Sequence, residues 1–99
     1  MFYRKKPIVI EADVYQNGME DGIVTVPMSA QRETARSWVG DAADDDTATI
    51  GLPYLSTLEG PMFIAQGDYV ITGVKGERYP CKEEIFNLTY ERVEDVPKS

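Results

Sequence analysis

The residues best suited to chemistry in this chain lie near its C-terminal end, around a single cysteine. Cys81 stands before Lys82 at the start of a predicted helix, where the lysine charge and the helix dipole both favour the thiolate. The sequence contains no histidine, which excludes Ser–His and Cys–His nucleophiles and histidine-based zinc sites. A free cysteine without a base is more often a small buried residue, so we expect no catalytic role for Cys81.

Acid and base chemistry without histidine would need two carboxylates held together. Candidates of this kind are Glu59, Glu77, Glu83 and Glu84. Their spacing brings no pair together, and a chain of 99 residues rarely builds the long cleft that a glycosidase needs. The sequence therefore predicts a protein that is not an enzyme and carries no cofactor.

Residues 41–47 contain a run of acidic side chains that invites a metal-binding interpretation. The carboxylates are those of Asp41, Asp44, Asp45 and Asp46. A calcium loop needs alternating oxygen ligands, a central glycine and a distal glutamate, whereas three adjacent aspartates cannot all face one ion. We predict a solvated loop that binds no metal, and its use as an acidic patch for a partner stays open.

A set of aromatic and basic residues in the last third could stack a planar ring and pair with a phosphate. The candidates for this ligand or partner face are Tyr69, Lys75, Arg78 and Tyr79. The same residue types would equally make an ordinary core. Residues 73–76 also match a GxxG pattern that clamps RNA in one module, but they lie between two predicted strands, so we interpret them as a hairpin turn.

These side chains sit on a segment whose pattern predicts structure well. Residues 69–72 are β-branched or aromatic and predict a strand, and residues 74–76 predict a turn that ends in a glycine at positive φ. The chain then returns over residues 77–81, where Pro80 should end regular pairing because it has no N–H. A short helix with two glutamates in its first turn follows, and residues 90–93 predict a closing strand.

The first half of the chain predicts two strands and a helix. Apolar residues alternate over residues 7–15, which indicates a strand with one solvated face. Residues 23–26 predict a second strand, which ends at Pro27. We expect Ser29 to cap a helix over residues 30–39, and Gly40 to end it.

The middle of the chain predicts a meander of short strands. Residues 48–52 and 54–57 form either two strands or one strand interrupted at Pro53, then residues 58–61 turn and residues 62–65 pair back. We therefore predict a single α+β domain over residues 1–99. Its architecture is a twisted antiparallel sheet or partly closed small barrel of short strands, with one packed helix and a short C-terminal helix.

Both ends of the chain resemble a known group of proteins. The segments YRKKPIVIEA, TLEGPM and GDYVITGVKGERYPCKEEIFNLTYERV resemble small proteins that are encoded by phages and prophages and have no assigned function. The resemblance covers about half of the residues and leaves out residues 15–53. It implies a phage-encoded accessory protein of the bacterial cytoplasm, and it supplies no catalytic residue.

The net charge of the chain limits the classes of partner that we expect it to bind. Seventeen acidic and ten basic residues give a net charge of −7 and a pI near 4.4, which opposes binding to nucleic acid or anionic lipid. No apolar run is long enough to span a membrane, so we expect a soluble protein of the host cytoplasm. The preferred function is a non-enzymatic phage protein that binds and inhibits a host protein. The alternatives are a protein that sequesters a nucleotide-like signal and a component of the virion; a homo-oligomer stays open.

Overall fold

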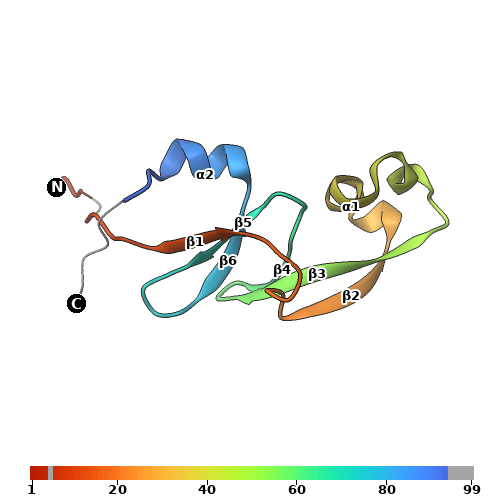
Figure 1. Ribbon diagram of the computed structural model, residues 1–99, viewed down its shortest axis with the longest axis horizontal. Helices are drawn as coiled ribbons and strands as arrows, with labels where there is room; N and C mark the ends of the chain where they lie inside the picture. The colour runs from red at the N-terminus through yellow and green to blue at the C-terminus, as the bar shows by residue number, and fades with distance from the viewer. Residues whose placement is uncertain (5, 94–99) are drawn as a thin grey trace.

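Two small antiparallel sheets and two α-helices make up the fold, which is α+β as the sequence predicts (Figure 1). The computed structural model describes residues 1–4 and 6–93. Within these residues the strands close no barrel and form two sheets instead of one. The first sheet has the order β1-β5-β6, with strands Glu11–Val14, Tyr69–Thr72 and Arg78–Cys81. The second has the order β2-β3-β4, with strands Gly22–Pro27, Thr49–Thr57 and Gly60–Phe63.

Helix α2 (Glu83–Thr89) covers one face of the first sheet. Its Phe86 ring stacks on Tyr69 with 4.0 Å between ring centroids, and Tyr90 stacks on Phe86 at 5.2 Å. The first turn of α2 holds Glu83 and Glu84, as predicted, where carboxylates complement the positive end of the helix dipole.

The β5–β6 hairpin has the predicted turn, in which Gly76 takes a φ of 81° and donates its N–H to the Gly73 carbonyl at 3.0 Å. The prediction that Pro80 ends pairing is wrong. Pro80 lies opposite Val70 inside β6, and the ladder continues to Cys81. Because β6 is an edge strand and Pro80 occupies a position whose N–H would point outward, the missing donor costs no ladder bond.

The predicted closing strand at the C-terminal end is also wrong, since residues 90–93 lie in no strand. Tyr90 follows Phe86 by four residues, which is the spacing of one helical face. The two rings therefore continue a single stack over the first sheet, and Tyr90 belongs with α2 and not with a new strand.

The main core joins the two sheets. Tyr15, Leu55, Ile64 and Val70 form one buried cluster, with Leu55 and Ile64 fully buried. Trp38 packs against this cluster and donates its indole N–H to the Ile64 carbonyl at 2.9 Å. A helix residue therefore anchors to the same core that holds the sheets together.

A second, smaller cluster seats helix α1 (Arg32–Val39) and the two short 3₁₀ turns beside it, η1 (Met28–Ala30) and η2 (Gly40–Asp44). Its buried residues are Met28, Ala35 and Ala43. The predicted cap at Ser29 is wrong, because Met28 is drawn into this cluster and residues 28–30 turn as 3₁₀ before the helix starts. Gly40 ends α1 as predicted, with a φ of 61°.

Strands β1, β3 and β4 differ most from the sequence pattern. Strand β1 covers only Glu11–Val14 of the predicted 7–15, because its partner β5 ends at Thr72 opposite Glu11. Strand β3 runs without a break through Pro53, which pairs with Ile23, so both predicted alternatives, two strands or one strand interrupted at Pro53, are wrong. Strand β4 begins two residues early, at Gly60, so the β3–β4 turn has only two residues.

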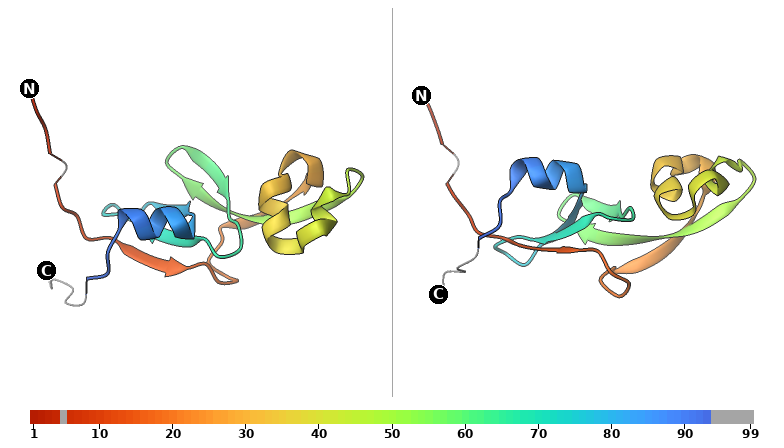
Figure 2. Two further views of the ribbon diagram at one scale, coloured as in Figure 1. Left: turned by 90° about the horizontal axis from the view of Figure 1, so that it is seen from above. Right: turned by 45° about the horizontal axis from the view of Figure 1, so that its top comes forward.

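The molecule is elongated, with extents of 50 × 32 × 24 Å and a radius of gyration of 16.0 Å, against about 13 Å for a typical domain of this length. Residues 1–4 and 6–10 run away from the sheets as an extended arm (Figure 2). In the described part of the chain, no helix combines the length and the apolar character needed to cross a membrane.

Candidate functional site

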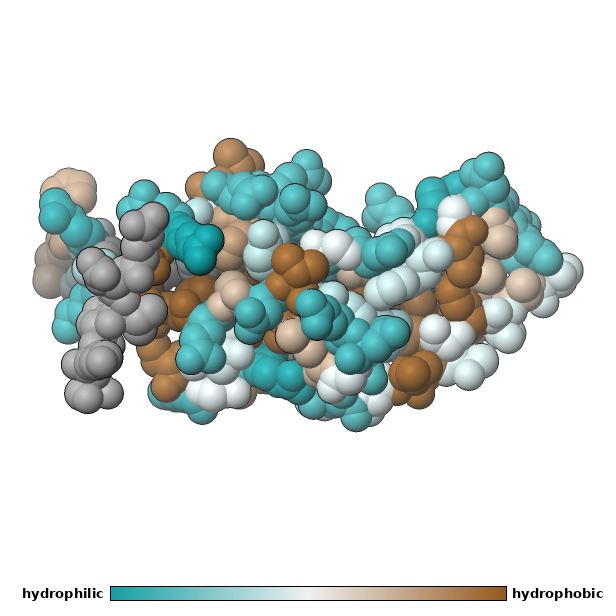
Figure 3. Space-filling view, viewed as in Figure 1, coloured by the Kyte–Doolittle hydropathy of each residue, from teal (hydrophilic) through white to brown (hydrophobic). Residues whose placement is uncertain are grey.

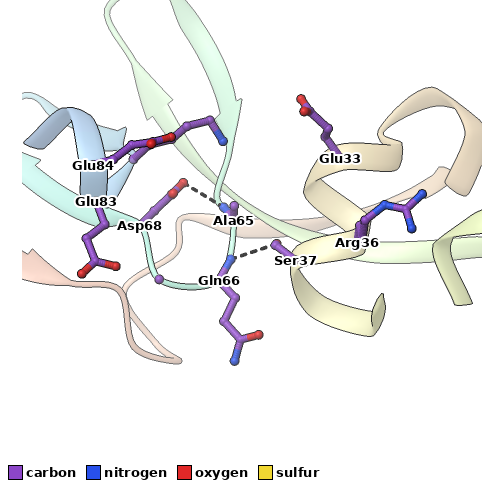
Figure 4. Close-up of a pocket in the computed structure, with 10 residues that line it drawn as sticks. Glu33, Arg36, Ser37, Ala65, Gln66, Asp68, Glu83 and Glu84 are labelled. Atoms are coloured by element: carbon purple, nitrogen blue, oxygen red, sulfur yellow. Dashed lines mark hydrogen bonds between the residues drawn. The ribbon is translucent and has the colours of Figure 1, made fainter. Parts of the chain in front are cut away.

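An open hollow of about 520 Å³ lies between α1, the turn before β5 and the start of α2 (Figure 4). Three segments that are distant in sequence line it. They contribute Glu33, Arg36 and Ser37 from α1, residues 65–68 from the turn, and Lys82, Glu83 and Glu84 from the start of α2. The hollow thus exists only when both helices are seated on their sheets.

The floor of the hollow is fixed by hydrogen bonds around Asp68. The buried Asp68 carboxylate accepts the Ala65 N–H at 2.9 Å, and its backbone N–H returns a bond to the Ala65 carbonyl at 3.1 Å. The Asp68 carbonyl accepts the Tyr15 N–H at 2.8 Å, which ties the turn to the end of β1. On the opposite wall, the Ser37 hydroxyl accepts the Gln66 N–H at 3.0 Å.

The charge lining the hollow is predominantly negative. Glu33, Glu83 and Glu84 are exposed, and the Asp68 carboxylate lies in the floor. The Arg36 guanidinium points away from the hollow, where it is bound by the Asp44 carboxylate. Four acidic residues and one lysine therefore line the hollow, a balance of charge that favours a cationic group.

The acidic side chains around the hollow are mostly open to solvent. Three of the carboxylates are exposed to solvent, and a general acid of raised pKa normally requires burial. No cluster of three or more histidine, cysteine, aspartate or glutamate side chains with the geometry to hold a metal occurs in residues 1–4 and 6–93.

The acidic run at residues 41–47 is partly neutralised by α1. Arg32 pairs with Asp46, and Arg36 pairs with Asp44 and lies 3.8 Å from Asp41. The Arg36 hydrogen bond holds the pKa of the Asp44 carboxyl below its usual value. Residues 40–44 form η2 instead of a continuous loop, because Ala43 is drawn into the second cluster.

Asp45 has an internal role. It accepts hydrogen bonds from the Thr47 N–H at 2.9 Å and the Thr47 hydroxyl at 2.6 Å, which lower the pKa of its carboxyl. The four aspartates thus brace α1 and their own turn, and they carry less free charge than the sequence suggests.

The predicted aromatic and basic face is divided between the two sides of the first sheet. Tyr69 and Tyr79 share one side, where α2 covers them. The Tyr79 and Tyr90 hydroxyls lie 3.4 Å apart, and this contact, together with burial, raises the pKa of Tyr79 to about 12. Both tyrosines therefore contribute to packing.

Arg78 projects from the other side. It donates to the Met19 carbonyl at 2.7 Å and pairs with Asp21, which joins β6 to the loop after β1. A second hollow of about 370 Å³ touches Arg78 and Tyr79 but not Tyr69 or Lys75. Since Asp21 already neutralises the Arg78 charge, this hollow offers little to a phosphate.

Cys81 has the opposite character from an activated thiol. Burial, together with the nearby Asp68 charge, raises the pKa of Cys81, whereas the sequence pointed to a lowered value. Its Sγ lies 3.6 Å from the adjacent Lys82 carbonyl, and no described histidine or carboxylate base accepts its proton. At neutral pH the thiol is protonated and poorly nucleophilic.

Comparisons with protein-family models, curated proteins and solved structures gave no match. The candidate site is therefore defined by geometry alone. Sequence reasoning missed the hollow because Glu33, Asp68 and Glu84 come from a helix, a turn and a second helix, and no local motif links them. The clustering of Glu83 and Glu84 at one helix start was the only local signal.

Proposed function

We propose that this chain is a non-enzymatic, phage-encoded accessory protein that binds a host protein through the acidic hollow and thereby inhibits it. The partner would present lysine or arginine side chains, in the manner of a surface that normally receives nucleic acid. Such a protein would act in the host cytoplasm. The resemblance of both chain ends to phage and prophage proteins supports this origin.

The observation that carries the proposal is the charge of the hollow. Glu33, Glu83 and Glu84 stand around a floor fixed by Asp68, while Arg36 is turned away to Asp44. A concave site of one sign concentrates field lines and speeds the encounter with a partner of opposite sign. An open site of this width is better suited to binding the side chains of a protein than to enclosing a small molecule.

A capture experiment with charge-matched variants tests this proposal. The full-length chain, tagged at its C-terminus, is used to recover host proteins from lysate, beside the hollow variant E33Q/E83Q/E84Q. Glutamine preserves the shape of each side chain and removes one negative charge at each position. We expect the main captured protein to be basic at its contact surface and to be lost at least about tenfold, or 1.4 kcal/mol, with the hollow variant.

The control is a variant with the same change in net charge outside the hollow. D13N/E59Q/E91Q neutralises three exposed carboxylates that do not line it. This variant should capture the partner as well as the wild type does, and circular dichroism should show both variants folded. If both variants lost the captured partner equally, net charge alone would explain binding. If both retained it equally, the contact would lie outside the hollow. Either result overturns the hollow as the binding site.

A further inference from the structure

The edge of the first sheet formed by β1 has no partner among the described residues. Strand β1 pairs only with β5, so its other side is free. Residues 6–10, which precede β1, are also extended and carry the same apolar alternation. Because β5 ends at Thr72, opposite Glu11, these residues have no paired residue in β5. The sequence pattern of a strand therefore extends over residues 6–10, where β5 provides no partner strand.

The backbone groups on this free edge can be identified. Tyr15 donates its N–H to the Asp68 carbonyl at 2.8 Å, so the N–H groups of Asp13 and Glu11 also point toward β5. Ala12 and Val14 therefore direct their N–H and C=O groups outward. Extending the same alternation along the chain places Ile8 and Ile10 outward too.

We propose that this edge pairs with the same edge of a second copy of the chain. Residues 6–14 of the two copies would run antiparallel about a two-fold axis at Ile10, which joins the two first sheets into one six-stranded sheet. In this register Ile8 lies opposite Ala12 of the other copy. Glu11 lies opposite Val9 and not opposite an acidic residue, so the pairing sets no like charges against each other.

Side chains on one face of the new sheet would be covered together. Val14 is paired with Tyr69, on which α2 is stacked, so α2 lies on the face of the even-numbered residues. On α2, Ile85 and Leu88 are exposed, and Figure 3 shows apolar residues at this helix as well as at other places on the surface. A two-fold axis perpendicular to the sheet brings both helices to the same face, where these apolar side chains can be buried.

Charge also favours a second copy as the occupant. In the sequence, residues 1–10 include three basic residues and no acidic one, whereas all seventeen acidic residues lie in the rest of the chain. In the proposed register, the arm of one copy extends beside the loop after β1 of the other. That loop carries the carboxylate of Glu20, so arm and loop are complementary in charge.

The exposed area is consistent with a dimer. The chain exposes 7788 Å², whereas a folded monomer of 11.1 kDa exposes about 5,700 Å². The difference of roughly 2,000 Å² per copy exceeds the roughly 800 Å² that each partner contributes to a standard interface.

Sedimentation equilibrium on the full-length chain tests the proposal. We expect a mass of about twice 11.1 kDa for the wild type at micromolar concentration. Ile8→Pro removes an N–H that points to the second copy without touching the β1–β5 ladder. It should raise the dimer dissociation constant at least tenfold.

The matched control is Val9→Pro, whose missing N–H points to the opposite side, where β5 has no paired residue. This variant should stay dimeric. A monomeric wild type at ~100 μM, or a dimer that Ile8→Pro leaves intact, overturns the proposal; a monomer whose Ile8→Pro variant loses a captured host protein would assign the edge to that protein instead. Neither result depends on the hollow, so the proposed function is tested separately.

Discussion

Leu55→Ala is expected to lower the free energy of unfolding by about 2–5 kcal/mol, the usual cost of a cavity at a fully buried leucine. Leu55 has no exposed surface and touches the cluster of Tyr15, Ile64 and Val70, through which the two sheets meet. A domain of this size has about 5–15 kcal/mol of stability in total, so the loss is a large fraction. Urea denaturation followed by circular dichroism measures it.

The control for this variant lies three residues further along the same hairpin. Leu58 is 84% exposed, so Leu58→Ala should change the free energy of unfolding by less than about 0.5 kcal/mol. The comparison removes any general effect of deleting a leucine. Similar midpoints for the two variants would contradict a core in which the sheets share one cluster.

Arg78→Met is expected to lower the free energy of unfolding by about 1.5–3 kcal/mol, because it removes charge-assisted hydrogen bonds. The guanidinium donates to the Met19 carbonyl and pairs with Asp21, both on the loop after β1. Methionine keeps most of the apolar stem and removes the charge. Thermal unfolding should therefore show a lower Tm, with the loop as the first region to exchange its amides.

The same variant separates the structural role of Arg78 from a nucleotide site. Lys75→Met removes an exposed charge in the hairpin turn and should leave Tm nearly unchanged. If Arg78 and Lys75 instead bound a nucleotide-like ligand, nucleotides would raise the Tm of the wild type and of neither variant. A stable Arg78→Met protein that has lost such a shift would contradict the structural role.

Local patterns predicted the fold wherever one segment determines its own structure. The turn at Gly76 and the two glutamates at the start of α2 follow from residue type alone. The predictions failed where the position or length of a neighbouring strand determines the pairing. Pro80 stays paired because β6 is an edge, and β1 stops at Glu11 because β5 ends there.

The candidate site was less predictable than the fold, since its side chains come from separate segments. The sequence placed weight on Asp44 and Arg78 as free charges, but each is paired within the chain, with Arg36 and Asp21. Pairing of this kind depends on which elements become neighbours, which no local spacing reveals. Glu33 and Asp68 gave no signal because they meet only after α1 and the turn are seated.

A titration of the captured host protein with the purified chain tests most directly whether the chain inhibits its partner by stoichiometric binding. We predict that the partner's activity falls linearly to its minimum at a fixed stoichiometry. Intact mass spectrometry should then recover both proteins unmodified, and the hollow variant E33Q/E83Q/E84Q should need more protein for the same effect. Complete inactivation by a small fraction of one equivalent, with a covalent change in the partner, would show turnover and contradict the account.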